Sequence, residues 1–107
     1  MIYELRIYEV APNRMPNLHR RFQEVTLRLF EKHGMRVVGF WEPVIGTSNQ
    51  LIYLMAYEDL NQRQRQWDAF LSDPEWQQAK AESEADGPIT VRVVNSILRP
   101  TPYSPLQ

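Results

Sequence analysis

Side chains at the start of the chain alternate between two faces, which predicts a β-strand. The pattern covers residues 2–10, IYELRIYEV, and ends at Pro12 and Asn13. In a strand, successive side chains point to opposite sides of the sheet, so every second residue shares a face. One face of this strand carries Leu5 and Ile7. The other face carries Glu4, Arg6 and Tyr8.

A helical pattern follows, from about Asn13 to His33. Four apolar residues recur at spacings of four, three and four, and so form one stripe along a helix: Leu18, Phe22, Val25 and Leu29. Gly34 supplies the expected end, because glycine adopts the left-handed cap conformation without a steric penalty.

Two further strands are predicted at residues 35–45, MRVVGFWEPVI, and 50–58, QLIYLMAYE. Residues 46–49, GTSN, separate the two runs and are typical of a turn. The two strands are therefore expected to form a hairpin.

The second helical region is predicted to consist of two pieces. Asp59 is suited to cap the first piece, and Gln62, three residues on, completes a capping box. Asp73 followed by Pro74 is a second start signal, since an N-cap acceptor precedes a proline where the missing N–H costs nothing. The second piece runs to about Asp86. The first piece is expected to bury Leu60, Trp67, Phe70 and Leu71.

A fourth strand is predicted at residues 89–98, ITVRVVNSIL, and a proline-rich extended tail follows it. The order β-α-β-β-α-β, with right-handed crossovers, predicts an α+β fold of the ferredoxin-like type. Such a fold has a four-stranded antiparallel sheet with both helical regions on one face. We expect a single domain over residues 1–99 and a tail over residues 100–107.

Composition narrows the possible partners and surroundings. With 107 residues the chain builds one core, and its formal net charge of -1 leaves no electrostatic footprint for nucleic acid or an anionic membrane. It has no cysteine, which excludes disulfides and thiolate chemistry. No apolar stretch approaches the roughly 18 residues of a membrane span, and no secretory signal is present at the start. We therefore expect a soluble cytoplasmic protein.

One face of the predicted sheet has no helix to cover it, and that face is expected to be apolar. We assign Leu5, Ile7, Ile52, Leu54 and Ala56 to the face that packs on the helices. Alternation then sends a second set to the open side: Tyr8, Tyr53, Met55 and Tyr57, joined by Val38 and Phe40 or by Val37 and Trp41.

A contiguous apolar patch on a water-soluble protein usually marks an interface. The sequence therefore predicts a homodimer in which two open faces stack into a closed barrel. The alternative is that the tail folds back over its own subunit, but the tail has too few residues to cover four strands. A related hypothesis is that the tail crosses onto the partner, with Tyr103 and Leu106 as apolar anchors.

Several motifs together resemble the NIPSNAP family of the dimeric α/β barrel superfamily. They are YELRIYEV from Tyr3, VVGFW at Val37 to Trp41, LIYLMAYEDL from Leu51, DPEW at Asp73 to Trp76, and SPL at Ser104 to Leu106. The resemblance implies a ferredoxin-like protomer and a homodimer. The superfamily includes cofactor-free monooxygenases, haem-degrading enzymes and aldoxime- and muconolactone-type enzymes, but no reaction is established for this branch. The family strand often has His and Trp where this chain has Tyr53 and Met55.

The best candidate site combines polar groups of two strands. Its ligand-binding candidates are Glu4, Arg6, Tyr8, Tyr53 and Tyr57, which we expect to line one wall of the barrel interior among aromatic surfaces. In a catalytic role, Arg6 would hold a carboxylate or enolate and Glu4 would act as the base. The simpler interpretation is that Glu4 and Arg6 form an ion pair at the dimer interface. Arg92 or Arg36 could join either arrangement.

The remaining chemistry-bearing residues favour structural roles. His19 and His33 are the only histidines, and without carboxylates at ligand spacing they predict no metal site. His33 is expected at a helix C-terminus and His19 in solvent. The later helical region has no histidine, whereas haem enzymes of the superfamily commonly use one there, so we expect no cofactor. Trp67, Phe70 and Trp76 are expected in the core, and Arg63 and Arg65 on a solvated surface.

The sequence thus predicts a homodimer that binds a small, partly apolar ligand inside the barrel, with cofactor-independent oxidation or isomerisation as the candidate reaction. The alternative is a non-catalytic interaction or ligand-sensing module with a solid barrel core. A cavity of about 300 Å³ or more that touches Glu4, Arg6 and tyrosine hydroxyls would favour the ligand site.

Overall fold

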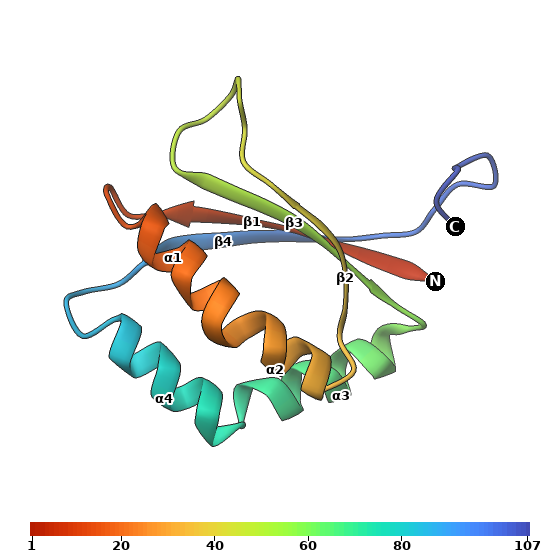
Figure 1. The fold of residues 1–107 in the computed structure, drawn as a ribbon. Coiled ribbons are helices and arrows are strands. Elements are labelled where there is room, and N and C mark those ends of the chain that lie inside the picture. Colours follow the sequence, from red (N-terminus) through yellow and green to blue (C-terminus); the bar gives the residue numbers. More distant parts are fainter.

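The computed structural model describes all 107 residues and contains one four-stranded antiparallel sheet with its helices on one side (Figure 1). The strands are β1 (Ile2–Val10), β2 (Arg36–Trp41), β3 (Gln50–Tyr57) and β4 (Thr90–Leu98). They lie in the order β2-β3-β1-β4, and all neighbouring strands are antiparallel. The predicted ferredoxin-like fold class is confirmed.

The first helical region is one continuous helix with a wider turn in its middle. It comprises α1 (Met15–Arg21), the π-helical segment η1 (Phe22–Thr26) and α2 (Leu27–Lys32). A π-helical turn inserts an extra residue per hydrogen-bonded ring and so rotates the residues that follow. Thr26 and Phe30 therefore join the predicted stripe of buried side chains, while Val25 is only half-buried.

The second helical region is divided as the sequence predicts, into α3 (Leu60–Leu71) and α4 (Pro74–Ser83). Asp59 accepts a hydrogen bond from the backbone N–H of Gln62 at 2.7 Å, so the predicted cap of α3 is confirmed. The expected burial of Leu60 and Leu71 was wrong, because they lie in the terminal turns of α3 and are 60% and 54% exposed. None of the helices combines the length and the apolar composition that a membrane span requires.

The sequence assigned the two faces of the sheet the wrong way round. Tyr53, Met55 and Tyr57 are almost completely buried and belong to the core beneath the helices. Alternation fixes which side chains share a face, but it does not fix which face meets the helices. The open face instead carries four apolar residues that were predicted to pack on the helices: Leu5, Ile7, Ile52 and Leu54, which pair in register across β1 and β3. Val94 of β4 lies beside Ile7 on the same face.

A bulge in β2 also changes the expected face assignments at this edge. The register between β2 and β3 shifts between Val37 and Gly39. Val37 and Phe40 consequently both pack against the core, although they are three residues apart. Strand β2 ends at Trp41, earlier than the predicted residue 45, and residues 42–49 form a loop whose Val44 and Ile45 are 99% and 96% exposed.

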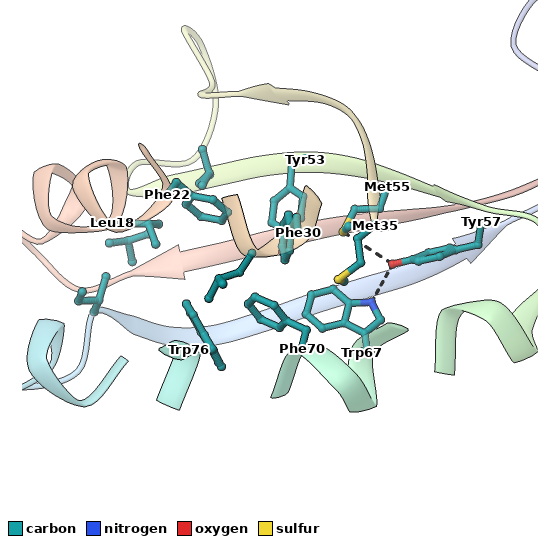
Figure 2. Close-up of a cluster of buried hydrophobic side chains, with 14 residues drawn as sticks. Leu18, Phe22, Phe30, Met35, Tyr53, Met55, Tyr57, Trp67, Phe70 and Trp76 are labelled. Atoms are coloured by element: carbon teal, nitrogen blue, oxygen red, sulfur yellow. Dashed lines mark hydrogen bonds between the residues drawn. The ribbon is translucent and has the colours of Figure 1, made fainter. Parts of the chain in front are cut away.

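Aromatic side chains fill the space between the sheet and the helices (Figure 2). Phe70 packs on Phe30 and Trp76 with ring centroids 5.0 and 4.7 Å apart, and Trp67 lies 5.6 Å from Phe70. The predicted core roles of Trp67, Phe70 and Trp76 are confirmed. Tyr53 reaches into the same cluster from β3, so the sheet contributes polar aromatic groups to a largely apolar core.

Asp73 joins the end of the first helical region to the start of α4. It accepts a hydrogen bond from the backbone N–H of Glu75, and its second oxygen lies 2.9 Å from Lys32 Nζ and 2.7 Å from His33 Nε2. Hydrogen bonds from Lys32 and His33, with that from the backbone of Glu75, hold the pKa of the Asp73 carboxyl well below its usual range. His33 is the C-cap of α2, as predicted, and its ring contacts a carboxylate that the sequence did not point to.

Replacing Asp73 with alanine should therefore cost more stability than the same change at Asp59. The Asp59→Ala variant loses one exposed cap, worth about 1 kcal/mol. The Asp73→Ala variant loses a cap and also the side-chain contacts with Lys32 and His33, so its free energy of unfolding should fall further in urea denaturation. Because the folded-state pKa is lowered, the advantage of Asp73 is present above the usual aspartate range and disappears as the pH falls through the folded value. Equal losses in the two variants at neutral pH would contradict this role.

Candidate functional site

The candidate residues from the sequence do come together, but on the helix side of the sheet. Arg6 and Tyr53 are directly opposite each other in the β1 and β3 register, and Glu4 and Tyr8 extend the same row along β1. The expectation that they line the barrel interior was wrong, because this row faces α3 and the aromatic core. A barrel interior would be formed by the opposite face.

Glu4 is the centre of a buried hydrogen-bond network. Its carboxylate is completely buried and accepts five hydrogen bonds, from Tyr57, Asn95 and Arg6 and two from Arg63. Burial alone would raise the pKa of Glu4, but these donors, led by Arg63, outweigh it and lower the pKa to about 2. The carboxylate is therefore ionised at neutral pH, and its oxygens are already occupied by protein donors. This arrangement is unsuited to the general base that the sequence suggested.

Two members of this network were missed by sequence reasoning. Arg63 was expected on a solvated surface, yet its Nε and Nη2 lie 2.9 and 2.8 Å from the two Glu4 oxygens. Its position four residues before Trp67 places it on the buried side of α3, and that spacing could have revealed it. Asn95 donates to Glu4 from β4, where it lies opposite Arg6. No pattern in the sequence indicated this contact, because Asn95 is a single asparagine in an exposed edge strand.

Arg6 links the Glu4 network to two tyrosines. Its Nη1 lies 3.1 Å from Glu4 Oε2, and its Nε donates to the Tyr53 hydroxyl at 2.7 Å. The guanidinium carbon lies 4.3 Å from the Trp67 ring centroid, a cation–π contact. Burial raises the pKa of Tyr53 well above its usual value, so this hydroxyl stays protonated. The predicted ion pair of Glu4 and Arg6 is present, but it lies on the helix side of the sheet and not on the open face, where a dimer interface was expected.

Tyr57 connects the carboxylate to α3. Its hydroxyl donates to Glu4 Oε1 at 2.8 Å and accepts from Trp67 Nε1 at 2.7 Å, the contact drawn from Trp67 in Figure 2. Burial also raises the pKa of Tyr57 above its usual value. Tyr57 and Glu4 therefore hold strands β1 and β3 against α3, and their polar atoms are used within the protein.

A cavity of about 460 Å³ lies beside this network, between the sheet and the helices. Arg6 and Tyr8 line its wall on the sheet side, whereas Glu4 does not reach it. Its apolar walls come from both helical regions and include Phe22, Phe30, Trp67, Phe70 and Trp76. Its exposed lining residues lie on the edge strand β4, on α4 and at the end of α3, so this is where the cavity opens to solvent.

The two histidines lie outside the cavity. His19 Nε2 is 3.3 Å from Glu42 Oε1, and both side chains are partly exposed. His33 contacts Asp73 at the junction of the helices. No group of three or more histidine, cysteine, aspartate or glutamate side chains lies close enough together to hold a metal ion.

Comparison with known proteins places the chain among relatives of the same fold. A curated NipSnap homologue from Dictyostelium discoideum is 32% identical over 106 residues, which covers 99% of this chain and 40% of the relative. This chain therefore spans only about two fifths of that protein's length.

Solved structures agree with this result. An uncharacterized NIPSNAP-like domain protein from Burkholderia xenovorans is 34% identical, with a TM-score of 0.86 over 97% of this chain and 88% of the other. A NIPSNAP family protein from Agrobacterium tumefaciens matches with a TM-score of 0.89 over 99% and 98% of the two chains, and its 24% identity supports the fold alone. The NIPSNAP family model matches residues 3–105, and the chain therefore belongs to the NIPSNAP family.

Proposed function

We propose that this protein binds a small, partly apolar molecule in the cavity between its sheet and its helices. The observation that carries the proposal is an aromatic cavity of about 460 Å³ with the half-buried polar side chains of Arg6 and Tyr8 in its wall. Natural ligand sites have volumes of about 300 to 1,000 Å³ and a few polar groups on mainly apolar walls. The cavity fits that description.

The polar groups favour binding over catalysis. Glu4 is saturated by protein donors and lies outside the cavity lining, so it is not available to take a proton from a ligand. Arg6 and Tyr8 do line the cavity, and they are groups that orient a bound molecule. Ligand binding is therefore the function that we propose.

The second part of the proposal is a homodimer formed through the open sheet face. Leu5, Ile7, Ile52 and Leu54 are only half-buried in one protomer, and Val94 is 38% exposed beside them. A stable interface typically buries about 800 Å² of surface on each partner. An exposed apolar sheet face is the kind of surface that such an interface buries. A second copy of the chain offers the same apolar face and so satisfies both surfaces at once.

Two segments flank this face. The loop of residues 42–49 and the C-terminal tail both rise on the side of the sheet away from the helices (Figure 1). The tail turns back onto one end of the face, where the Tyr3 hydroxyl donates to the carbonyl of Gln107. It leaves the apolar residues at the centre of β1 and β3 uncovered, which supports a partner rather than the tail as their cover.

The cavity and the dimer interface would use opposite sides of the sheet. A barrel core filled by interlocking apolar side chains is therefore compatible with ligand binding, so a solid core and a ligand site are not the alternatives that the sequence suggested. Whether the protein binds a ligand therefore depends on the cavity between the sheet and the helices, and not on the barrel core. Its occupancy and the dimer can be tested separately.

Enlarging Val93 should block the cavity. Val93 lines the opening and is 40% exposed, so Val93→Phe places a ring in the mouth. Binding of the neutral fluorescent probe N-phenylnaphthylamine should weaken by about tenfold or more, since a misfit in an apolar pocket is worth roughly 1 to 3 kcal/mol. The control is Ile97→Phe, which is 42% exposed on the same strand and outside the cavity. Binding that is unchanged in Val93→Phe, or absent from the native protein, would count against the site.

A charge on the open face should separate the dimer. Val94→Asp buries an unpaired carboxylate in the proposed interface, which costs about 3 kcal/mol or more and weakens association by roughly a hundredfold. Val93→Asp is the matched control, because Val93 has nearly the same exposure but faces the helices. Sedimentation velocity should give a dimer for native protein and Val93→Asp and a monomer for Val94→Asp. A native particle of 12.7 kDa would refute the dimer.

A further inference from the structure

The hydroxyl of Tyr8 has a hydrogen with no acceptor in the protein. The hydroxyls of Tyr8 and Tyr53 are 2.7 Å apart, and Tyr53 also accepts from Arg6 Nε. Tyr53 is completely buried and its oxygen has no other neighbour that could accept its hydrogen, so it donates to Tyr8. Tyr8 makes no other hydrogen bond, and its own O–H remains available. Tyr8 therefore acts as a donor at the cavity wall.

Arg6 is also only partly used by the protein. A guanidinium carries five N–H donors. The Nε of Arg6 donates to Tyr53 and its Nη1 to Glu4, while Nη2 donates to no protein group. The side chain is 13% exposed and lines the cavity, so Nη2 is a cationic donor beside that of Tyr8.

A third donor group lies on α1. Arg21 is only 7% exposed, lines the cavity and stacks its guanidinium 5.1 Å from the Trp76 ring centroid. Its Nη1 donates to Ser83 Oγ, but its buried Nε has no partner. Burial lowers the pKa of Arg21 from its ordinary value, which fits a cation that the protein leaves incompletely neutralised. An unpaired buried donor is costly, and a ligand acceptor would satisfy it.

Positive charges outnumber negative charges around the cavity. Glu4 is shared by Arg6 and Arg63, and Glu84 is shared by Arg21 and Lys80. Arg92 also lines the cavity and pairs with Glu9. The cavity and the adjoining network together therefore hold five cations and three carboxylates, although the whole chain has a formal net charge of -1. The local excess is positive and is partly enclosed by aromatic side chains, where the reduced dielectric strengthens attraction for an anion.

We infer that the ligand of this cavity is a small organic anion, with an apolar body between the aromatic side chains and a carboxylate-like group bound by Arg6, Tyr8 and Arg21. The inference rests on the proposed ligand site and names the class of molecule that it takes. Arg6, Arg21 and Tyr8 on its wall carry donors that the protein leaves free, and two of these three groups are cationic. This favours oxygen acceptors that carry negative charge over neutral ligands.

Two probes of equal size test the inference separately from the site itself. Naphthoate and naphthamide share one ring system and differ in the charge of the head group. Isothermal titration calorimetry with the purified native protein should show naphthoate binding about tenfold more tightly, a difference of about 1.4 kcal/mol, since hydrogen bonds to charged groups are stronger than those between neutral groups. Equal affinities would overturn the inference and leave the ligand site standing. Failure of both probes at about 1 mM would overturn the inference and the ligand site together.

Charge-removing variants locate the head group. Arg21→Gln and Arg6→Gln should each weaken naphthoate about tenfold and leave naphthamide nearly unchanged. Arg21→Gln is the more decisive variant, because Arg6→Gln also disturbs the Glu4 network. Tyr8→Phe should weaken naphthoate about fivefold. Arg65→Gln, an exposed arginine of α3 outside the cavity, is the control for net charge and should bind like the native protein. A preference for naphthoate that survives in Arg21→Gln and Tyr8→Phe would contradict the assignment.

Discussion

The hydrogen-bonded burial of the Glu4 carboxylate is the interaction on which the rest of this structure depends. An isolated buried carboxylate would be strongly destabilising, and this one is tolerated because donors from four elements, β1, β3, β4 and α3, surround it. Arg63 can reach Glu4 only if the polar row of β1 faces α3. The network therefore fixes which side of the sheet meets the helices, and so which side remains open.

That choice gives the two sides of the sheet different chemistry. The helix side combines tyrosine hydroxyls and guanidinium groups with aromatic rings, and these do not pack completely, which leaves the cavity. The open side has apolar side chains at its centre, as in an interface between subunits. The proposed ligand site and the proposed dimer interface therefore lie on opposite surfaces of the sheet. Arg6 contacts both the Glu4 network and the cavity, and so lies between them.

The sequence predicted the element order, the caps at Asp59 and Asp73 and the set of five clustered candidates, because these depend on local spacing and alternation. It could not predict which sheet face the helices cover, since both faces of β1 and β3 are rich in large side chains and alternation is symmetric between them. Arg63 and Asn95 were missed because their roles depend on contacts with residues distant in the chain. The bulge at Val38 likewise depends on pairing with β3.

The most direct test is the free energy of unfolding of Glu4→Gln measured beside Glu9→Gln. Both residues lie on β1, but Glu9 forms only an exposed ion pair with Arg92. Glu4→Gln should lose about 3 to 5 kcal/mol and Glu9→Gln less than about 1 kcal/mol. Because the pKa of Glu4 is lowered to about 2, the difference from native protein should shrink as the pH falls below 4.5 towards that value. A small, equal loss in both variants would show that Glu4 does not organise the fold.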